Sequence, residues 1–464
     1  MMEKTKWGFY IVPNFLSNLL RSFGVNKAIG FGVLTRMWSA LAGPLTILLI
    51  ATRFSKVEQG YYYTFSSLLA LQVFFELGLL TVLAQFAAHE FAFLEWGKKG
   101  EITGSDEHRE RFVDLLGKGV KWYLVSAVLL IVALIPSGFY FFTQSPASVI
   151  EFTWRLPWAL AVIGVGCNLL LIPFYAVITG SGDVASINRR EMMGGMAGSL
   201  IGWLVIACGG GLYAIPAVTT GTIIVGVVYL FRSKPRLVQA AFSHAFGSLR
   251  SSYTISWWGE VWPMQWKIAL SWVSGYFIFQ LFTPVLFKFH GPVVAGQMGM
   301  TLSAVNAVQG VCIMWFQTRG PEFGKLIALK NWQRLDTSFN QILKQAMVVS
   351  AVLSVVAVML IAGLQSYTTI GNRFLPVQSV MIFLVAVCCN VIINGWAIYM
   401  RAHRQEPMLL LSIIGAFLIG TSTFLLGMKY SSIGMAIGYC LITLLYGIPS
   451  TYACFKRFKE YCRI

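Results

Sequence analysis

Three ionisable side chains stand inside long apolar stretches of this sequence, namely Arg36, Glu76 and Lys267. An ionised group at membrane depth is costly and normally faces a cavity or a charged partner. Two cations against one acid favour the binding of an anion, because Arg offers a bidentate fork and Lys a mobile point charge. Two alternatives stay open. Arg36 and Lys267 can extend their long side chains to the membrane interface, and Glu76 can form a structural ion pair with Arg36 across adjacent helices.

The sequence carries no pattern for catalysis or for metal binding. The eight Cys include no C-x-x-C pair, and most of them lie in apolar runs as small buried hydrophobes. The five His stand at loop or interface positions. The longest polar insertions contain neither a phosphate-binding loop nor a nucleophile motif, and they lie at about 88–118, 232–260 and 318–341. We therefore expect no enzyme activity, no catalytic residue, no bound metal and no cofactor.

The composition indicates the kind of element that must position these residues. Hydrophobic residues make up 57% of the 464-residue chain and charged residues only 11%, whereas soluble proteins carry about 25% charged residues. The apolar runs reach about 20 residues, enough to cross a bilayer as a helix. Residues 1–27 are amphipathic and basic, without a signal-peptide cleavage site, and we expect them to lie on the inner membrane face. The fold class predicted is an all-α, polytopic membrane protein.

Hydropathy predicts about twelve transmembrane helices. Their approximate bounds are 28–51, 61–87, 119–142, 154–179, 192–210, 212–231, 261–287, 293–317, 342–364, 374–400, 406–427 and 432–454. The fifth and sixth are separated only by the turn signal Gly209-Gly210-Gly211. Within the fifth, Gly194, Gly198 and Gly202 form a ladder of small residues that permits close helix packing.

The Lys and Arg residues set the orientation. With the N-terminus inside, most of the 35 fall on inside segments, in an excess of more than four to one. The outside segments hold Arg53, Lys56, Arg155, Lys288, Arg373 and Lys429. We predict a protein of the bacterial inner membrane with both termini in the cytoplasm. The net charge of +17 is then explained by cytoplasmic Lys and Arg residues that face anionic lipid. Nucleic-acid binding is not needed to explain it.

The outside loops are short, and their only acids are Glu58 and Glu151. Membrane polymerases, ligases and transferases that work on the outer face usually need a substantial outer loop bearing acids or His. This sequence has no room for such a loop. The class that remains is a transporter.

The loop at 232–260 divides the chain after six helices. The first helix of each half carries a lone cation, Arg36 or Lys267, and the second begins with a comparable turn at Gly60 or Gly296. This pattern is typical of two parallel six-helix lobes with a central cavity between them. The predicted organisation is an amphipathic segment 1–27, a first lobe 28–231, a cytoplasmic linker 232–260, a second lobe 261–455 and a cytoplasmic tail 456–464.

The segment RMWSALAGPLTILLIATRFSKVEQGYYYTFSSLLALQVFFELGL resembles the opening helix pair of Wzx-type polysaccharide flippases, in the multidrug/oligosaccharidyl-lipid/polysaccharide (MOP) exporter superfamily. The features that carry the resemblance are an Arg early in the first helix, the Ser-Lys-Val-Glu-Gln-Gly turn and the acid-Leu-Gly of the second helix. WPMQWKIALSWVSGYF and GPVVAGQMGMTLSAVNAVQG resemble the start of the second lobe in exopolysaccharide-cluster members. The motifs are diffuse, so they indicate a family and not a substrate.

The resemblance implies transfer of an undecaprenyl-pyrophosphate-linked oligosaccharide from the inner to the outer leaflet. Arg36 and Lys267 would then bind the pyrophosphate across the cavity, near Glu76. Polar side chains that could bind the sugars, or else simply pack between helices, are Gln72, Gln85, Asn306 and Gln309. The expected partners are this lipid-linked substrate, the bilayer and other polysaccharide-assembly proteins.

Two other functions compete with a flippase. A cation-coupled drug exporter of the same superfamily should line its site with carboxylates, which one acid against two cations disfavours. A non-transporting scaffold would not need charges inside the membrane. Neither the identity of the sugar nor a coupling ion can be read from the sequence.

Overall fold

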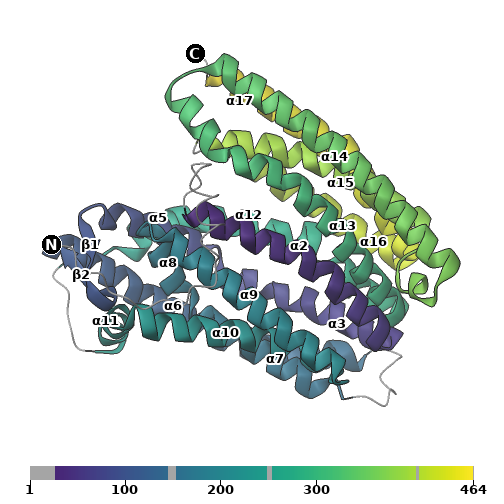
Figure 1. The fold of residues 1–464 in the computed structure, drawn as a ribbon, viewed down its shortest axis with the longest axis horizontal. Helices are drawn as coiled ribbons and strands as arrows, with labels where there is room; N and C mark the ends of the chain where they lie inside the picture. Colours follow the sequence, from purple (N-terminus) through teal and green to yellow (C-terminus); the bar gives the residue numbers. More distant parts are fainter. Residues whose placement is uncertain (1–26, 145–152, 248–252, 404–406, 463–464) are drawn as a thin grey trace, which may run out of the picture.

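The computed structural model describes residues 27–144, 153–247, 253–403 and 407–462. The predicted amphipathic segment 1–27 lies outside these residues except for Lys27. Helices form nearly all of the described chain (Figure 1), and its only strands are β1 (Leu94–Trp96) and β2 (Ile102–Gly104), a short antiparallel hairpin. The all-α class is therefore confirmed.

Ten α-helices lie among the described residues 27–144 and 153–247. They are α2 (Lys27–Arg53), α3 (Lys56–Leu69), α4 (Val73–Glu76), α5 (Leu79–Phe91), α6 (Asp106–Thr143), α7 (Arg155–Leu169), α8 (Ile172–Gly180), α9 (Val184–Ala207), α10 (Ala214–Ser233) and α11 (Pro235–Phe246). Single 3-10 turns, η1 (Ala70–Gln72), η2 (Lys98–Gly100) and η3 (Gly211–Tyr213), connect some of them.

The second half begins with a short π-helix and continues with longer helices. They are η4 (Trp257–Val261), α12 (Trp262–Phe279), α13 (Phe282–Ala328), α14 (Trp332–Tyr367), η5 (Thr369–Arg373), α15 (Val377–Ala402), α16 (Leu409–Ile442), η6 (Thr443–Gly447) and α17 (Ile448–Tyr461). The linker predicted at 232–260 contains the helix α11, and the tail predicted at 456–464 is helical as far as Tyr461.

Each predicted membrane segment has a helical counterpart. By length and hydropathy alone, the described residues contain eight helices able to cross a membrane, or nine when the bent pair Lys56–Glu76 and Leu79–Phe91 counts as one span. Two of these spans, Trp257–Phe316 and Leu409–Tyr461, are interrupted by non-helical backbone at Gly291 and at Ser431. Each of the two therefore holds two predicted segments. The helix α9 corresponds to the remaining predicted segment, 192–210. The chain is therefore a multi-pass membrane protein.

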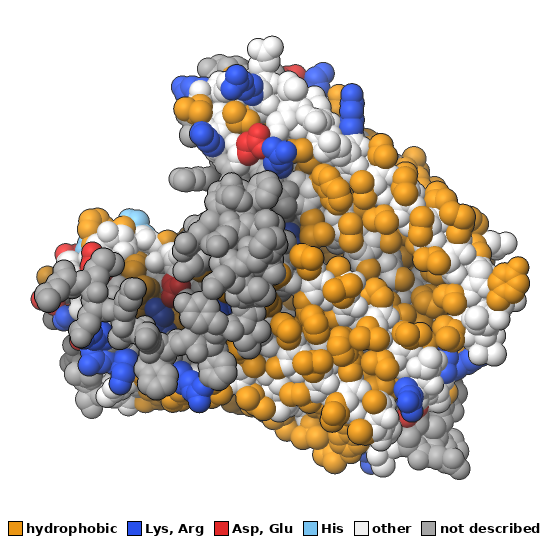
Figure 2. All heavy atoms as spheres, in the orientation of Figure 1, with side chains coloured by type: hydrophobic (Ala, Val, Ile, Leu, Met, Phe, Trp, Pro, Cys, Tyr) orange, Lys and Arg blue, Asp and Glu red, His pale blue; other side chains and the backbone are white. Residues whose placement is uncertain are grey.

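The helices form two lobes that meet at one end and diverge toward the other (Figure 1). The first lobe contains α2–α11, and the second contains α13–α17. The closed end, where the lobes touch, holds η5 and the start of α3; the open end holds the hairpin β1–β2, α11 and the end of α17. Figure 2 shows hydrophobic side chains over the flanks of both lobes, as expected for surfaces that contact lipid.

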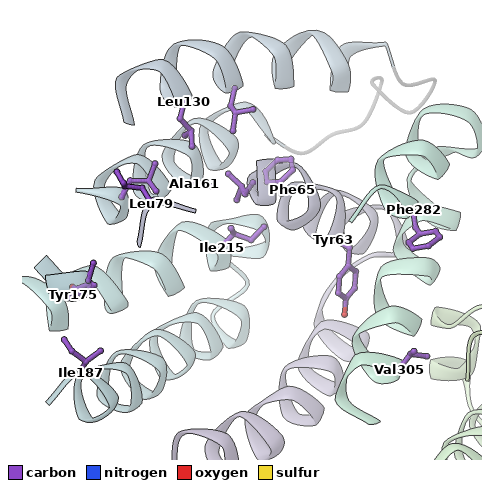
Figure 3. Close-up of a cluster of buried hydrophobic side chains, with 14 of the residues drawn as sticks. Tyr63, Phe65, Leu79, Leu130, Ala161, Tyr175, Ile187, Ile215, Phe282 and Val305 are labelled. Atoms are coloured by element: carbon purple, nitrogen blue, oxygen red, sulfur yellow. The ribbon is translucent and has the colours of Figure 1, made fainter. Parts of the chain in front are cut away.

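Close packing within the first lobe follows from small residues and aromatic rings. A Cβ on Gly198 would lie 2.7 Å from the carbonyl oxygen of Val218, so the glycine lets α9 and α10 touch. The ladder prediction is confirmed there, and α9 ends at Ala207, next to the predicted Gly209–Gly211 turn. Figure 3 shows buried hydrophobic side chains, among them Phe65 of α3, Leu130 of α6 and Ala161 of α7. The ring of Phe65 packs 5.0 Å from that of Trp158 on α7.

Candidate functional site

The two lobes are joined at the closed end by a buried amide. The side chain of Gln59 on α3 is 1% exposed, and its Nε2 donates hydrogen bonds to the carbonyl oxygens of Gly296 at 2.9 Å and Arg373 at 3.0 Å. The Arg373 guanidinium donates in return to the Phe54 carbonyl at 2.6 Å and to Gln59 Oε1 at 3.3 Å. Burial lowers the pKa of Arg373 below its ordinary value, and Glu58 opposes that shift. The hydrogen bonds of Gln59 and Arg373 to these partners can form only while the lobes touch.

Glycines allow the backbones of α3 and α13 to meet at this end. A Cβ on Gly60 would lie 1.9 Å from the Pro292 carbonyl oxygen, and one on Gly299 would lie 2.2 Å from Cβ of Tyr63. Both distances are far below van der Waals contact. Larger side chains at these positions would therefore force the lobes apart at the closed end.

One face of α13 changes its surroundings along its length. Gly296, Gly299 and Ser303 are spaced by three or four residues and share the face that meets α3. The same spacing continues to Asn306 and Gly310, and both of these are exposed. Asn306 therefore continues this face beyond the described contact with α3. Gln309 lies beside this face and is half-buried.

Arg36 has an equivalent place on α2. It precedes Phe54 by five helical turns of 3.6 residues, and Phe54 is the residue whose carbonyl binds Arg373 of the second lobe. Nearly opposite Arg36 on the helix, the ring of Trp38 packs 5.7 Å from that of Trp203 on α9. Arg36 is exposed and forms no hydrogen bond or ion pair with the described residues. It therefore lies on the side of α2 that faces away from α9, and the structure does not pair it with any described residue of the second lobe.

Lys267 is exposed on α12, the helix that begins the second half of the chain. Its Nζ lies 5.8 Å from the ring centroid of the neighbouring Trp266, and no described carboxylate forms an ion pair with it. The helix α12 contacts both lobes: it packs along α16, and Tyr276 places its ring 5.5 Å from that of Phe74 on α4. No contact in the described chain joins Lys267 to Arg36.

Glu76 occupies a break in the second membrane segment, which the sequence predicted as one continuous helix at 61–87. The backbone is left-handed at Leu77, with φ of 50°, and at Gly78, with φ of 65°, and the two parts of the segment are bent by 44°. The carboxylate is buried, and the Tyr123 hydroxyl of α6 donates to it at 3.4 Å.

The alternative that Glu76 pairs with Arg36 is therefore wrong for this conformation. Glu76 is directed toward Tyr123 of α6, whereas Arg36 is exposed on the side of α2 opposite Trp38. A Cβ on Gly78 would lie 2.5 Å from Cγ2 of Ile268, so α12 packs directly on the break. Of the other polar candidates, Gln72 is half-buried beside the break and Gln85 is exposed on α5. The structure joins neither of them to Arg36.

A group of ionic contacts near the open end was not expected from the sequence. Glu90 is 2% exposed, and it accepts from Arg111 Nε at 2.9 Å while its other oxygen lies 2.7 Å from His108 Nδ1. The same guanidinium donates to Glu260 at 3.0 Å. The only sequence signal is the spacing of His108 and Arg111, which places them on one face of α6. These contacts tie η4, and with it the start of α12, to the first lobe.

Asp114 strengthens this connection. It is buried, accepts from Lys118 Nζ at 2.8 Å and from the Ile255 backbone N–H at 2.8 Å, and lies 3.6 Å from Nε2 of His244. Lys118 also donates to the Ile255 carbonyl at 2.6 Å. The segment before α12 is thus held by charge-assisted hydrogen bonds on both sides of its backbone.

No protein-family model matches the chain, and no curated protein is similar to it in sequence. Solved structures are similar in fold. The lipid II flippase MurJ in an inward closed conformation shares 12% identity with a TM-score of 0.57, covering 94% of this chain and 90% of that one. The MATE multidrug transporter DinF-BH, in complex with a ligand, shares 11% identity with a TM-score of 0.54, and 98% of each chain is covered.

A third similar structure is the inward-facing conformation of a multidrug resistance MATE family transporter of the MOP superfamily. It shares 14% identity with a TM-score of 0.53, covering 91% of this chain and 99% of that one. At these identities the likeness concerns the fold. The chain therefore has the two-lobe fold of MOP superfamily transporters, to which MATE transporters and MurJ belong.

Proposed function

We propose that this chain transfers an undecaprenyl-pyrophosphate-linked oligosaccharide from the inner to the outer leaflet of the bacterial inner membrane, for the synthesis of exopolysaccharide, capsule or O-antigen. The observation that carries the proposal is Arg36, a cation within the first membrane helix that is exposed and has no ion-pair partner among the described residues. A diphosphate is the kind of group that a guanidinium binds through paired hydrogen bonds. The fold supports the transporter class, and the sequence resemblance to Wzx-type flippases supports the substrate class.

The positive-inside bias assigns the open end to the cytoplasm. The hairpin β1–β2, the helix α11, the start of α14 and the end of α17 all lie on segments rich in Lys and Arg. In this assignment both termini are cytoplasmic, and the described conformation is open toward the leaflet where lipid-linked sugars are made. Transport would then require the open end to close and the contacts of Gln59 and Arg373 to separate.

In the proposed mechanism the two lobes present different groups to the substrate. Arg36 on α2 and Lys267 on α12 would hold the pyrophosphate, and Asn306 on α13 would donate or accept a hydrogen bond to a sugar. The lipid tail of the substrate would remain in the bilayer and reach its head group through the gap between the lobes. Outward movement of roughly two negative charges is favoured by about 2.3 kcal/mol per charge per 100 mV of potential, so the step needs no chain of proton-carrying acids.

A multidrug exporter is the second candidate, and the fold of DinF-BH and of the MATE transporter favours it. The charges argue against it. Glu76 is buried against Tyr123, whereas Arg36 and Lys267 are exposed. A site built for cationic drugs would present its carboxylate to the space between the lobes and would keep its cations away.

The test uses purified protein in liposomes that carry a fluorescent undecaprenyl-pyrophosphate-linked oligosaccharide. Arg36→Ala should reduce the transfer rate by tenfold or more, since a charged hydrogen bond is worth about 1.5–3 kcal/mol. Arg53→Ala is the matched control, because Arg53 is an exposed cation at the closed end of the same helix. Equal rates in wild type and Arg36→Ala would overturn the anion-site proposal, and export of a cationic dye that is abolished by Glu76→Gln would favour the drug exporter instead.

A further inference from the structure

One arginine near the open end of the molecule is buried inside the first lobe. Arg190 on α9 is 8% exposed, and its guanidinium lies over the ring of Tyr175 on α8, with Cζ 4.0 Å from the centroid. Its Nε and Nη2 have no hydrogen-bond partner, and no described carboxylate forms an ion pair with it. Its neighbour Arg189 is exposed. A buried charge is strongly unfavourable unless an opposite charge or hydrogen-bond acceptors compensate it.

Two buried phenol hydroxyls, neither in a hydrogen bond of good geometry, lie around the same point. A Cβ on Gly226 of α10 would lie 2.1 Å from Tyr175 Oη and 2.9 Å from Arg190 Nη2, so both groups converge on the bare face of this glycine. The Tyr229 hydroxyl, one helical turn further along α10, is also buried and lies near Arg190 as well as Ser186 and Asp183. Three helices thus bring one guanidinium and two phenol hydroxyls to one place.

The nearest acids do not neutralise this charge. Asp183 is engaged by Lys234, whose Nζ lies 3.2 Å from its carboxylate. Glu191 is close enough to Tyr175 to act on it electrostatically, but it forms no ion pair with Arg190. The guanidinium therefore leaves this place positively charged, unlike a site for a cation.

We propose that Arg190, Tyr175 and Tyr229 form a binding site for a phosphate-bearing anion inside the first lobe, distinct from the space between the lobes. Guanidinium and phenol donors match the acceptor oxygens of a phosphate. All three residues lie within about two turns of the open-end termini of α8, α9 and α10, at the depth expected for lipid head groups. The phosphate can therefore come from a phospholipid or from solution. The site does not depend on the proposed transport function.

The experiment compares the full-length wild-type protein with Arg190→Gln and with Arg189→Gln, which removes the same charge from the exposed face one residue away. In the first arm, thermal unfolding in detergent is followed as inorganic phosphate replaces chloride at constant ionic strength. In the second arm, native mass spectrometry measures the retention of phosphatidylglycerol against that of a phosphate-free galactolipid. Stabilisation by inorganic phosphate identifies a soluble anion, and selective retention of phosphatidylglycerol identifies a lipid head group.

Wild type and Arg189→Gln should respond alike in at least one arm, and Arg190→Gln should lose affinity by about tenfold or more, as expected for one charged hydrogen-bonding group. If Arg190→Gln does not fold, Tyr229→Phe replaces it in both arms, because it keeps the ring and removes only the hydroxyl; a smaller loss of affinity is then expected. The proposal is overturned if wild type responds in neither arm, or if the altered protein that folds responds like Arg189→Gln.

Discussion

The amide of Gln59 provides a direct test of how the closed end is held. Gln59→Ala removes two donated hydrogen bonds and one accepted bond between the lobes. At about 0.5–1.5 kcal/mol for each bond, the closed arrangement should lose roughly 2–4 kcal/mol relative to conformations in which the lobes are apart. Since about 1.4 kcal/mol corresponds to a tenfold change in an equilibrium constant, the equilibrium between the closed and the open arrangement of this end should shift by a factor of roughly 30–1,000 toward the open one.

Labelling of a buried position can measure this shift. Met300 on α13 is fully buried, and its sulfur lies 3.8 Å from the Gln59 amide, so a cysteine there should react with a polar maleimide only when the closed end opens. The assay uses Met300→Cys in a variant without the eight native cysteines. Gln59→Ala should accelerate labelling strongly.

The matched control is Gln297→Ala. Gln297 also donates an amide hydrogen bond at the closed end, to the Asn372 carbonyl at 2.9 Å, but both residues belong to the second lobe. This control should leave the labelling of Met300→Cys unchanged. Equal labelling with and without the Gln59 amide, or equal acceleration by both alanine variants, would refute the assignment of the interlobe contact to Gln59.

Four further predictions concern charge and topology. Because Glu76 and Arg36 do not touch, the effects of Glu76→Gln and Arg36→Ala on the free energy of unfolding should add within about 0.5 kcal/mol, and a larger coupling would show that they meet in another conformation. Lys267→Arg should retain more transfer activity than Lys267→Ala, and collapse of the membrane potential at fixed pH should slow transfer in vesicles; indifference to potential would contradict the driving force. Cysteines placed beside Arg373 should be labelled from outside intact cells and those beside Lys99 spared, and the reverse pattern would invert the topology.

The helices could be predicted from the sequence because hydropathy is a local property. Each of the apolar runs forms a helix, and the Gly209–Gly211 signal does separate two of them. The break after Glu76 could not be predicted in the same way, although Gly78 stands in the sequence. Leu77 also adopts a left-handed backbone there, which a leucine rarely does, and the packing of Ile268 on Gly78 that accompanies it joins residues far apart in the chain.

The partners of the charged residues were harder to predict. Glu76 meets Tyr123 from another helix, so helical spacing carries no sign of the contact. Arg190 stands beside Arg189 in the sequence, and only the folded lobe distinguishes the buried side chain from the exposed one. The two lone cations, Arg36 and Lys267, were identifiable because an isolated charge in an apolar run is itself unusual.

The attachment of the segment before α12 to the first lobe has a mechanical consequence. Repeat symmetry assigns α12 to the second half of the chain, but Arg111, through Glu260, and Asp114, through Ile255, bind its starting end to α6. If the lobes rock against each other, this end of α12 must travel with the first lobe while its far end slides along α16. The chain would then bend at the short break between Phe279 and Phe282. In that case α12 couples the two lobes, because its start moves with the first lobe and its end moves with the second.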